Sequence, residues 1–473
     1  MKRGRLALLI ALITAEILSG FELAMIYSAL RYMIDDFGNP EAVGWAITGF
    51  LLASGVSAAI CGRLGDMYDR KRVLLIVIGL SLVGSLVSGF STGIGGVVTG
   101  RVIQGGAGAI FPLCVGIVRA EVRETSVPLF IGILAATMTV SAGLGSVIGG
   151  ILVDNLSWHW IFFTGAGVAV VALLFVMKFV PARASGKVEK GVNFSGGILF
   201  APAIVLLLLA ITKSAQWGWL DARILGFFAG GTILTGLWVN SELKARVPLI
   251  QVRLLAQRQM LAAVLAGALL GLTWFQFLQI WSILLQQPTA TGVGLGLSAT
   301  MTGIVLLPQT LMALIGGPAA GWVYTRYGPR FTMSASALVL GAAWLVAAFK
   351  HDSLALILAI LIAMGLASSF LYATIPMIIA SAVPMNRTSE ATGLMSVIRV
   401  SAMGIGAQIV AYLLNTSTVP SPSGPGSFPD QSAYLLAMSY VIGGCLLIFV
   451  VARMLTNHSM AERHGAVPDS RRT

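Results

Sequence analysis

Apolar runs of about twenty residues, separated by short polar segments, recur along the whole chain and restrict its fold more than any other feature. A helix needs about 20 apolar residues to cross ~30 Å of hydrocarbon. Only 10% of the 473 residues are charged and 57% are hydrophobic, whereas a soluble protein carries about 25% charged residues. The mean hydropathy of +0.90 agrees. The pattern predicts an all-α polytopic membrane protein and excludes soluble, fibrous, disordered and disulfide-rich secreted classes.

Fourteen spans are predicted from the apolar runs and their breakers. They are 6–28, 43–61, 73–90, 95–118, 128–152, 158–180, 195–212, 222–240, 259–285, 298–324, 331–349, 353–382, 390–414 and 432–454. Of the 30 Lys and Arg residues, 24 fall on one side of this arrangement, four on the other and two within spans. The positive-inside rule then places both termini in the cytoplasm. The net charge of +12 is therefore explained by topology, and no nucleic-acid partner is expected.

No residue pattern indicates a metal, a nucleotide or a catalytic centre. Cys61, Cys114 and Cys445 lie in separate apolar stretches, which is typical of buried packing residues. The Gly292–Gly296 segment lacks the Lys-Ser/Thr of a phosphate-binding loop. We therefore expect no enzyme activity, no metal, no cofactor and no use of ATP.

Two segments of the chain resemble each other. Gly62–Arg72 closes the second predicted span, and Gly321–Arg330 closes the tenth. Each begins with Gly, has an aromatic residue six positions later and ends on basic residues. This echo indicates two six-span halves around a midplane site. The predicted organisation is a bundle at 1–180, a linker with two extra spans at 181–258, a second bundle at 259–456 and a tail at 457–473.

The Gly62–Arg72 loop resembles the signature loop of the major facilitator superfamily. The resemblance implies a cytoplasmic gate formed by Gly62, Asp66, Arg70 and Arg72, in which Asp66 pairs with Arg70 and accepts hydrogen bonds from a helix end. Asp69 stands where the family usually has Gly. The simpler interpretation is a basic loop that only fixes topology.

Two further segments are similar to motifs of this superfamily. Arg101–Ala109 resembles the fourth-span motif, and an Arg within a span normally faces a polar interior; otherwise it reaches outward to the interface. Ser141–Gly150 is similar to the fifth-span motif associated with antiporters, although Ser146 stands where Pro is usual. Its predicted helix-packing residues are Gly145, Gly149 and Gly150, and a plain packing face is the alternative.

The first span carries the acids expected to couple transport to protons. Phe21–Leu30 resembles the first-span motif of the fourteen-span drug:proton antiporters, with Glu22 as its acid. At 1.5 Å per residue, Glu16 lies roughly 15 Å and Glu22 roughly 24 Å along the span, pointing about 120° apart. Arg101 reaches a depth comparable to Glu22. The predicted proton-coupling residues are Glu22, Glu16 and Arg101; the alternatives are a hydrated helix-end Glu22 and an interhelical hydrogen-bonding Glu16.

Five residues are predicted to line a substrate cavity. Amides and aromatic rings mix in the ninth span, where Gln276 and Gln279 share a face. Such groups suit bulky amphipathic ligands, although lipid-facing rings with interhelical amides are an equal alternative. The predicted cavity residues are Tyr27, Trp274, Gln276, Gln279 and Arg399.

The resemblance implies a proton-coupled exporter of amphipathic small molecules that works by alternating access, driven by a proton gradient. Its expected partners are protons, the substrate and the lipid bilayer, and it is expected to act as a monomer in a bacterial inner membrane. Two alternatives stay open: a proton symporter that takes up a metabolite, and a lipid-handling protein without ion coupling.

Overall fold

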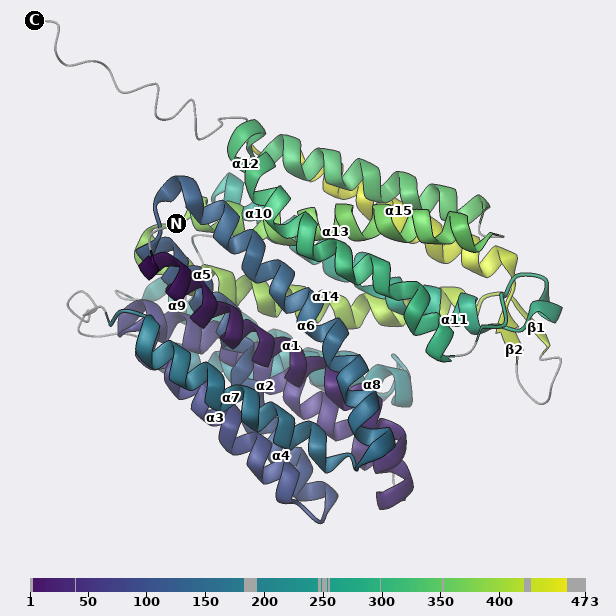
Figure 1. The fold of residues 1–473 in the computed structure, drawn as a ribbon, viewed down its shortest axis with the longest axis horizontal. Coiled ribbons are helices and arrows are strands. Elements are labelled where there is room, and N and C mark those ends of the chain that lie inside the picture. The colour runs from purple at the N-terminus through teal and green to yellow at the C-terminus, as the bar shows by residue number, and fades with distance from the viewer. Residues whose placement is uncertain are drawn as a thin grey trace, which may run out of the picture. The chain divides into compact units, whose positions relative to one another are not determined.

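The computed structural model describes residues 3–38, 40–182, 194–245, 248, 253, 256–297, 299–350, 353–420 and 427–456, and over these ranges the chain is almost entirely helical (Figure 1). The predicted tail at 457–473 and most of the basic segment at 181–194 lie outside the described residues. The α-helices are α1 (Arg3–Phe37), α2 (Pro40–Met67), α3 (Arg70–Phe90), α4 (Ile94–Gln104), α5 (Ile110–Glu121), α6 (Val127–Asn155), α7 (His159–Phe179), α8 (Phe194–Trp217), α9 (Ala222–Lys244), α10 (Arg258–Leu272), α11 (Phe277–Gln286), α12 (Ala299–Phe349), α13 (Leu354–Ala382), α14 (Thr388–Leu414) and α15 (Gln431–Ala452). The two strands, β1 (Thr418–Pro420) and β2 (Ser427–Pro429), pair antiparallel.

Twelve helical segments of the described chain are long and apolar enough to cross a membrane. One of them, Met301–Phe349, covers two predicted spans, 298–324 and 331–349. The two are separated at Gly328, where the backbone of α12 leaves helical geometry (φ 84°, ψ 170°). The apolar part of α8, Leu199–Ile211, is shorter and falls in another predicted span. The all-α membrane architecture is thus confirmed, and the count of fourteen spans stays a prediction.

α1 and α2 run past the ends of the predicted spans 6–28 and 43–61, whereas the apolar segments able to cross a membrane are Gly4–Ala29 and Ala42–Met67. α1 continues to Phe37 and is followed by Gly38 with a positive φ of 63°. α2 begins at Pro40 and continues to Met67, because no breaker precedes the Gly62–Arg72 loop. Asp69 occupies an extended conformation and caps α3, accepting a hydrogen bond from the Lys71 amide. An Asp therefore fits this position, because the backbone here does not need the conformations that only Gly adopts freely.

The fourth and ninth predicted spans are each interrupted by a short 3-10 helix. Gly105–Ala109 separates α4 from α5, and Trp274–Gln276 separates α10 from α11. At the first interruption a Cβ on Gly108 would overlap the Ser54 backbone and side chain. The Gly/Ala run thus brings this segment against α2 just beyond Arg101 and Gln104.

The helices form two compact units. The first contains Met1–Val122, Thr137–Gln257 and Ile379–Ser401, and the second contains Arg123–Ala136, Arg258–Ile378 and Ala402–Thr473. In the first unit α7 packs on α1 and α3, and α8 packs on α9; in the second, α12 and α15 lie side by side (Figure 1). The core of the first unit includes Phe21, Met25, Trp158 and Phe162.

Two helices are divided between the units. The first part of α6 belongs to the second unit, and the first part of α14 belongs to the first unit. Each half of the chain therefore contributes the start of one helix to the packing of the other unit. The predicted bundle boundaries at 180 and 258 stay a prediction.

The two echoed segments mark the points where these exchanged helix starts pack. A Cβ on Gly62 would lie 2.6 Å from the Ser389 carbonyl oxygen of α14. A Cβ on Gly321 would lie 2.7 Å from the Cα of Leu129 in α6. Only Gly permits such close backbone approach between helices. The leading Gly of each echoed segment thus has the same packing role within its own unit.

Candidate functional site

A polar cluster surrounds Glu22 inside the first unit, between α1, α3 and α4. Glu22 is buried, and its carboxyl group accepts hydrogen bonds from Ser81 Oγ at 3.2 Å and Ser85 Oγ at 3.4 Å. Gln104 Nε2 lies 3.5 Å from Glu22 Oε1 and 2.6 Å from Ser85 Oγ. Three uncharged donors from two other helices thus converge on one carboxyl group.

Arg101 contacts Glu22 through the backbone and through Gln104. Its Nη1 donates to the carbonyl oxygen of Glu22 at 2.9 Å and to Gln104 Oε1 at 3.1 Å. Its Nε donates to the Ala46 carbonyl at 3.1 Å, and the guanidinium lies over the Phe50 ring at 4.0 Å from the centroid. The predicted association of Glu22 with Arg101 is therefore bridged by Gln104, and the cation is held at a fixed distance from the carboxyl group.

Glu16 occupies a separate environment on the same helix. Its side chain is fully buried, and neither carboxyl oxygen has a hydrogen-bond partner among the described residues. The thiol of Cys114 on α5 lies beside this carboxyl group. An ionised carboxylate in such surroundings is costly unless it is paired. Glu16 and Glu22 are thus two distinct buried acids and not a carboxylate pair.

The predicted packing residues of α6 hold this part of α1 in place. A Cβ on Gly145 would lie 3.3 Å from the Cα of Phe21, and one on Gly149 would lie 3.1 Å from the Met25 carbonyl oxygen. Ser28 Oγ donates to the Ser146 carbonyl at 2.8 Å. Gly150 has no neighbour within 4 Å of its Cβ position. Gly145 and Gly149 therefore pack against the Phe21–Met25 stretch of α1, while Gly150 lies outside this contact.

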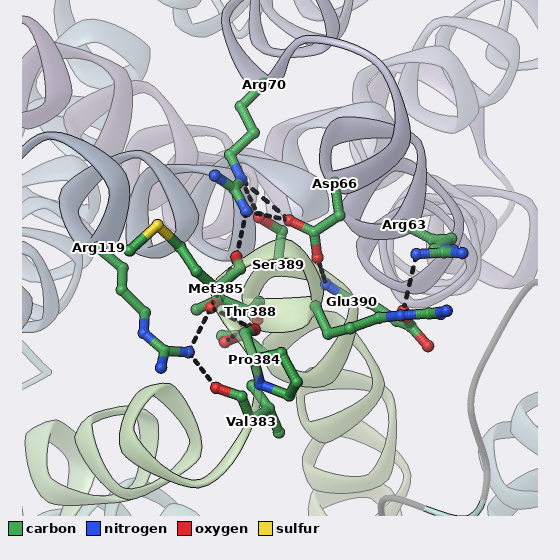
Figure 2. Close-up of polar contacts among 12 residues, drawn as sticks. Arg63, Asp66, Arg70, Arg119, Val383, Pro384, Met385, Thr388, Ser389 and Glu390 are labelled. Carbon is green, nitrogen blue, oxygen red and sulfur yellow. Dashed lines mark hydrogen bonds and ion pairs between the residues drawn. The ribbon is translucent and has the colours of Figure 1, made fainter. Parts of the chain in front are cut away.

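The predicted gate residues join the end of α2 and the start of α3 to the start of α14 (Figure 2). Arg70 Nη2 lies 2.6 Å from Asp66 Oδ1. The other oxygen of Asp66, Oδ2, accepts a hydrogen bond of 2.9 Å from the Glu390 amide. A carboxylate at a helix N-terminus is stabilised by the free amides and by the helix dipole. Asp66 thus caps α14 from the end of α2.

Arg70 adds two contacts across the same junction. Its Nη2 donates to the Met385 carbonyl at 2.6 Å, and its Nε donates to Ser389 Oγ at 3.2 Å. Arg72 behaves differently: its side chain is 82% exposed, and its closest acid is Asp69 at 3.8 Å. The structure therefore brings Gly62, Asp66 and Arg70 together at this junction and leaves Arg72 outside it.

Four charged residues of this junction were not among the predicted gate residues. Glu390 accepts from Arg387 at 2.9 Å and lies 3.4 Å from Arg63. Arg119, in the last turn of α5, donates to the Val383 carbonyl at 2.5 Å and to Thr388 Oγ1 at 2.8 Å (Figure 2). We call the set Arg63, Asp66, Arg70, Arg119, Arg387, Ser389 and Glu390 the latch cluster. The sequence showed these arginines only as topology signals; the partners of Arg63 and Arg119 lie more than 260 positions away.

The predicted cavity residues fall in both units. Tyr27 is 50% exposed in the first unit, and Arg399 is half-buried in α14. In the second unit Trp274 is buried and stacks on Phe277, with ring centroids 4.9 Å apart.

The two glutamines of the ninth span differ. Gln276 is buried, and its amide donates to the Gly271 carbonyl at 3.1 Å and to the Met403 carbonyl at 3.0 Å. Gln279 is half-buried. The Gln276 amide thus fixes the 3-10 interruption and α14, and the shared cavity stays a prediction.

Comparison with known proteins identifies the class. A profile of the Major Facilitator Superfamily matches residues 12–407. The chain belongs to the Major Facilitator Superfamily. It is a membrane transporter and not an enzyme.

Relatives include export and resistance proteins. The chain is 27% identical over 397 residues to the tetracenomycin C resistance and export protein of Streptomyces glaucescens, covering 83% of this chain and 71% of that protein. It is 25% identical over 336 residues to multidrug resistance protein 3 of Bacillus subtilis (strain 168), covering 70% of this chain and 63% of that protein. A uridine/deoxyuridine transporter of Lactococcus lactis subsp. cremoris (strain MG1363) is 30% identical over 336 residues, covering 68% of both chains.

The fold also matches a solved structure. The crystal structure of the human organic anion transporter MFSD10 (TETRAN) superposes with a TM-score of 0.59, covering 96% of this chain and all of that one, at 15% identity. The chain therefore has the major facilitator fold.

Proposed function

We propose that the protein exports amphipathic small molecules in exchange for protons. The observation that carries this proposal is the pair of buried acids on α1: Glu22 in a cluster of neutral donors beside Arg101, and Glu16 without a hydrogen-bond partner among the described residues. A proton that binds either carboxyl group removes a charge from a buried site. The export and resistance proteins among the relatives support the direction of transport.

The cycle we propose is rocker-switch alternating access. In this scheme the latch cluster holds the start of α14 on α2 in one access state and releases it in the other. Protonation of Glu22 or Glu16 changes the charge inside the first unit and shifts the balance between the two access states. Release of substrate and uptake of a proton then alternate. In this scheme the pore never opens at both ends.

We further propose that the protein lies in a bacterial cytoplasmic membrane with both termini in the cytoplasm, and that it acts as a monomer. The 24-to-4 distribution of Lys and Arg supports the orientation. Fusions to alkaline phosphatase at each terminus test it: both should be inactive, and an active fusion at either end would refute the orientation.

The central experiment measures transport in everted vesicles from a pump-deficient host. Vesicles with an acidic lumen should accumulate a cationic dye when they contain the parent protein. Glu22→Gln and Glu16→Gln should each abolish this accumulation, and the exposed Glu124→Gln should not. If both buried-acid variants follow the pH gradient like the parent, the proton-coupling assignment is wrong.

Direction distinguishes the proposal from uptake of a metabolite. The uridine/deoxyuridine transporter among the relatives makes nucleosides the first compounds to test. Right-side-out vesicles with an acidic exterior should fail to concentrate uridine if the protein is an exporter. Proton-dependent concentration of uridine would favour the symporter instead.

A further inference from the structure

Of the two inserted helices, α8 packs along one side of α2 and α9 packs on α8. Near one end, Lys213 Nζ lies over the Trp45 ring at 4.7 Å from the centroid. Near the middle, a Cβ on Gly55 would be 3.4 Å from Leu208 Cδ1. At the other end, the Phe200 and Trp238 rings pair at 4.9 Å. The helix pair therefore follows α2 from the Trp45 end to the latch end.

At the latch end the pair also contacts α14. An apolar cluster there joins three parts of the first unit: α2, the α8–α9 pair and the start of α14. Its buried members, which we call the bridging cluster, are Ala59, Met67, Phe200, Trp238, Leu394 and Val397. Val397 is 2% exposed and Phe200 1% exposed. Apolar burial of this size stabilises the arrangement that contains it.

The start of α14 uses two adjacent faces. Ser389 and Gly393 face α2, where a Cβ on Gly393 would overlap the Ala58 carbonyl oxygen. Leu394 and Val397 belong to the bridging cluster together with Phe200 and Trp238. α14 then continues past Ser401 into the second unit. Any movement of α14 away from α2 must therefore also break the bridging cluster.

We propose that the α8–α9 pair is a positioning element of the transport cycle, in which Phe200 and Trp238 hold the start of α14 against α2 and so stabilise the latched state. The latch cluster supplies ionic contacts at the first turn of α14. The bridging cluster supplies apolar contact along its side, which is insensitive to salt and to the charge state of Asp66 or Glu390. The inserted pair thereby sets how often this end opens.

A thiol-accessibility experiment tests the proposal without substrate or proton gradient, so its result is independent of the proposed export function. Ser396→Cys places a reporter on the α14 face shared with Ser389 and Gly393, in a chain whose three native cysteines are replaced by alanine. Removing a large buried side chain should shift the equilibrium strongly, so Trp238→Ala should raise the alkylation rate about tenfold. Trp238→Phe should restore most of the slow rate.

The matched control is Trp219→Ala, which removes an aromatic ring from the turn that joins α8 to α9. Trp219 stacks on Phe228 and is not part of the bridging cluster. Its alkylation rate should equal that of the parent. If Trp219→Ala and Trp238→Ala accelerate alkylation equally, or neither does, the proposal is overturned.

A double-mutant cycle keeps the test decisive if Trp238→Ala folds poorly. Val397→Ala is milder and lies on the α14 side of the cluster. Combined with Phe200→Ala, its effect on the alkylation rate should be clearly less than the product of the two single effects, because both remove the same contact. Combined with Trp219→Ala, the effects should multiply. Multiplicative effects in both pairs would contradict the proposal.

Discussion

At the scale of single residues, the two acids of α1 differ in what surrounds them. Glu22 is connected to Arg101 by Gln104, which donates to the carboxyl group and accepts from the guanidinium. Glu16 is fully buried and has the thiol of Cys114 beside it. The sequence showed both acids and the depth of Arg101. It did not show that a side chain from the same helix as Arg101 connects the charges.

Gln104→Leu should reduce proton-driven dye accumulation about tenfold, because it removes the connection between Arg101 and Glu22 and leaves a buried charge with fewer partners. Expression and thermal stability in detergent should change little. Gln259→Leu, which loses a hydrogen bond to Thr456 at an exposed position, is the control. If the two variants transport the dye equally, Gln104 has no role in the proton-coupling site.

Asp430 gives a prediction about pH and stability. Hydrogen bonds from Ser417, Ser432 and the Ala433 amide lower the pKa of this helix-capping carboxyl group to about 2. Because the folded-state pKa is lower than the unfolded-state value, the stabilisation is complete above pH ~4 and is lost as the pH falls toward 2. Asp430→Ala should therefore lower Tm at pH 6, and the difference from the parent should shrink below pH 4. A difference that is constant from pH 6 to pH 3 would show that the cap contributes through packing.

At the scale of helices, close approach of backbones decides which faces meet. α14 crosses α2 at two contact points, Gly62 with Ser389 and Gly393 with Ala58. The echo between Gly62–Arg72 and Gly321–Arg330 was visible in the sequence. The role of its glycines was not, because the helix that each one contacts comes from a distant part of the chain.

Gly393→Ala should destabilise the protein by about 1–3 kcal/mol and reduce transport, because a Cβ there overlaps the Ala58 carbonyl and forces the helices apart. Gly167→Ala in α7, where a Cβ has no neighbour within 4 Å, is the matched control. Thermal unfolding in detergent and dye accumulation measure the two effects. A variant at Gly393 that is as stable as the one at Gly167 would contradict this packing.

At the scale of the whole molecule, sequence patterns were sufficient for the class of fold and insufficient for the closing contacts. Apolar runs and basic loops predicted an all-helical membrane protein, and the echoed segments and the family resemblance predicted a transporter of two related halves. The latch cluster depends on pairs such as Asp66 with the Glu390 amide, which are 324 positions apart. Neither hydrophobic periodicity nor motif spacing in the sequence indicates which residues form such a pair. The same holds for Arg119 and the Val383 carbonyl.

Asp66→Asn should slow turnover about tenfold while KM changes little, because the cap on α14 is weakened in one access state and the substrate site is untouched. Asp69→Asn in the same loop is the control, since Asn still accepts from the Lys71 amide and caps α3. Initial rates of dye transport over a range of concentrations separate kcat from KM. If only KM changes, Asp66 does not act in the gate.

The two echoed glycines also imply that the halves respond differently to their medium. Four positions after Gly62 stands Asp66, but four positions after Gly321 stands Thr325, whose hydroxyl donates to the Gly321 carbonyl of its own helix. The start of α14 is thus held by ionic contacts. The start of α6 is held by close backbone packing at Gly321. These ion pairs are largely buried, so dissolved ions weaken them less than exposed pairs, and dissolved ions do not affect the backbone contact. Raising the salt concentration should therefore loosen the start of α14 before the start of α6, so that two segments alike in sequence respond differently to the same medium.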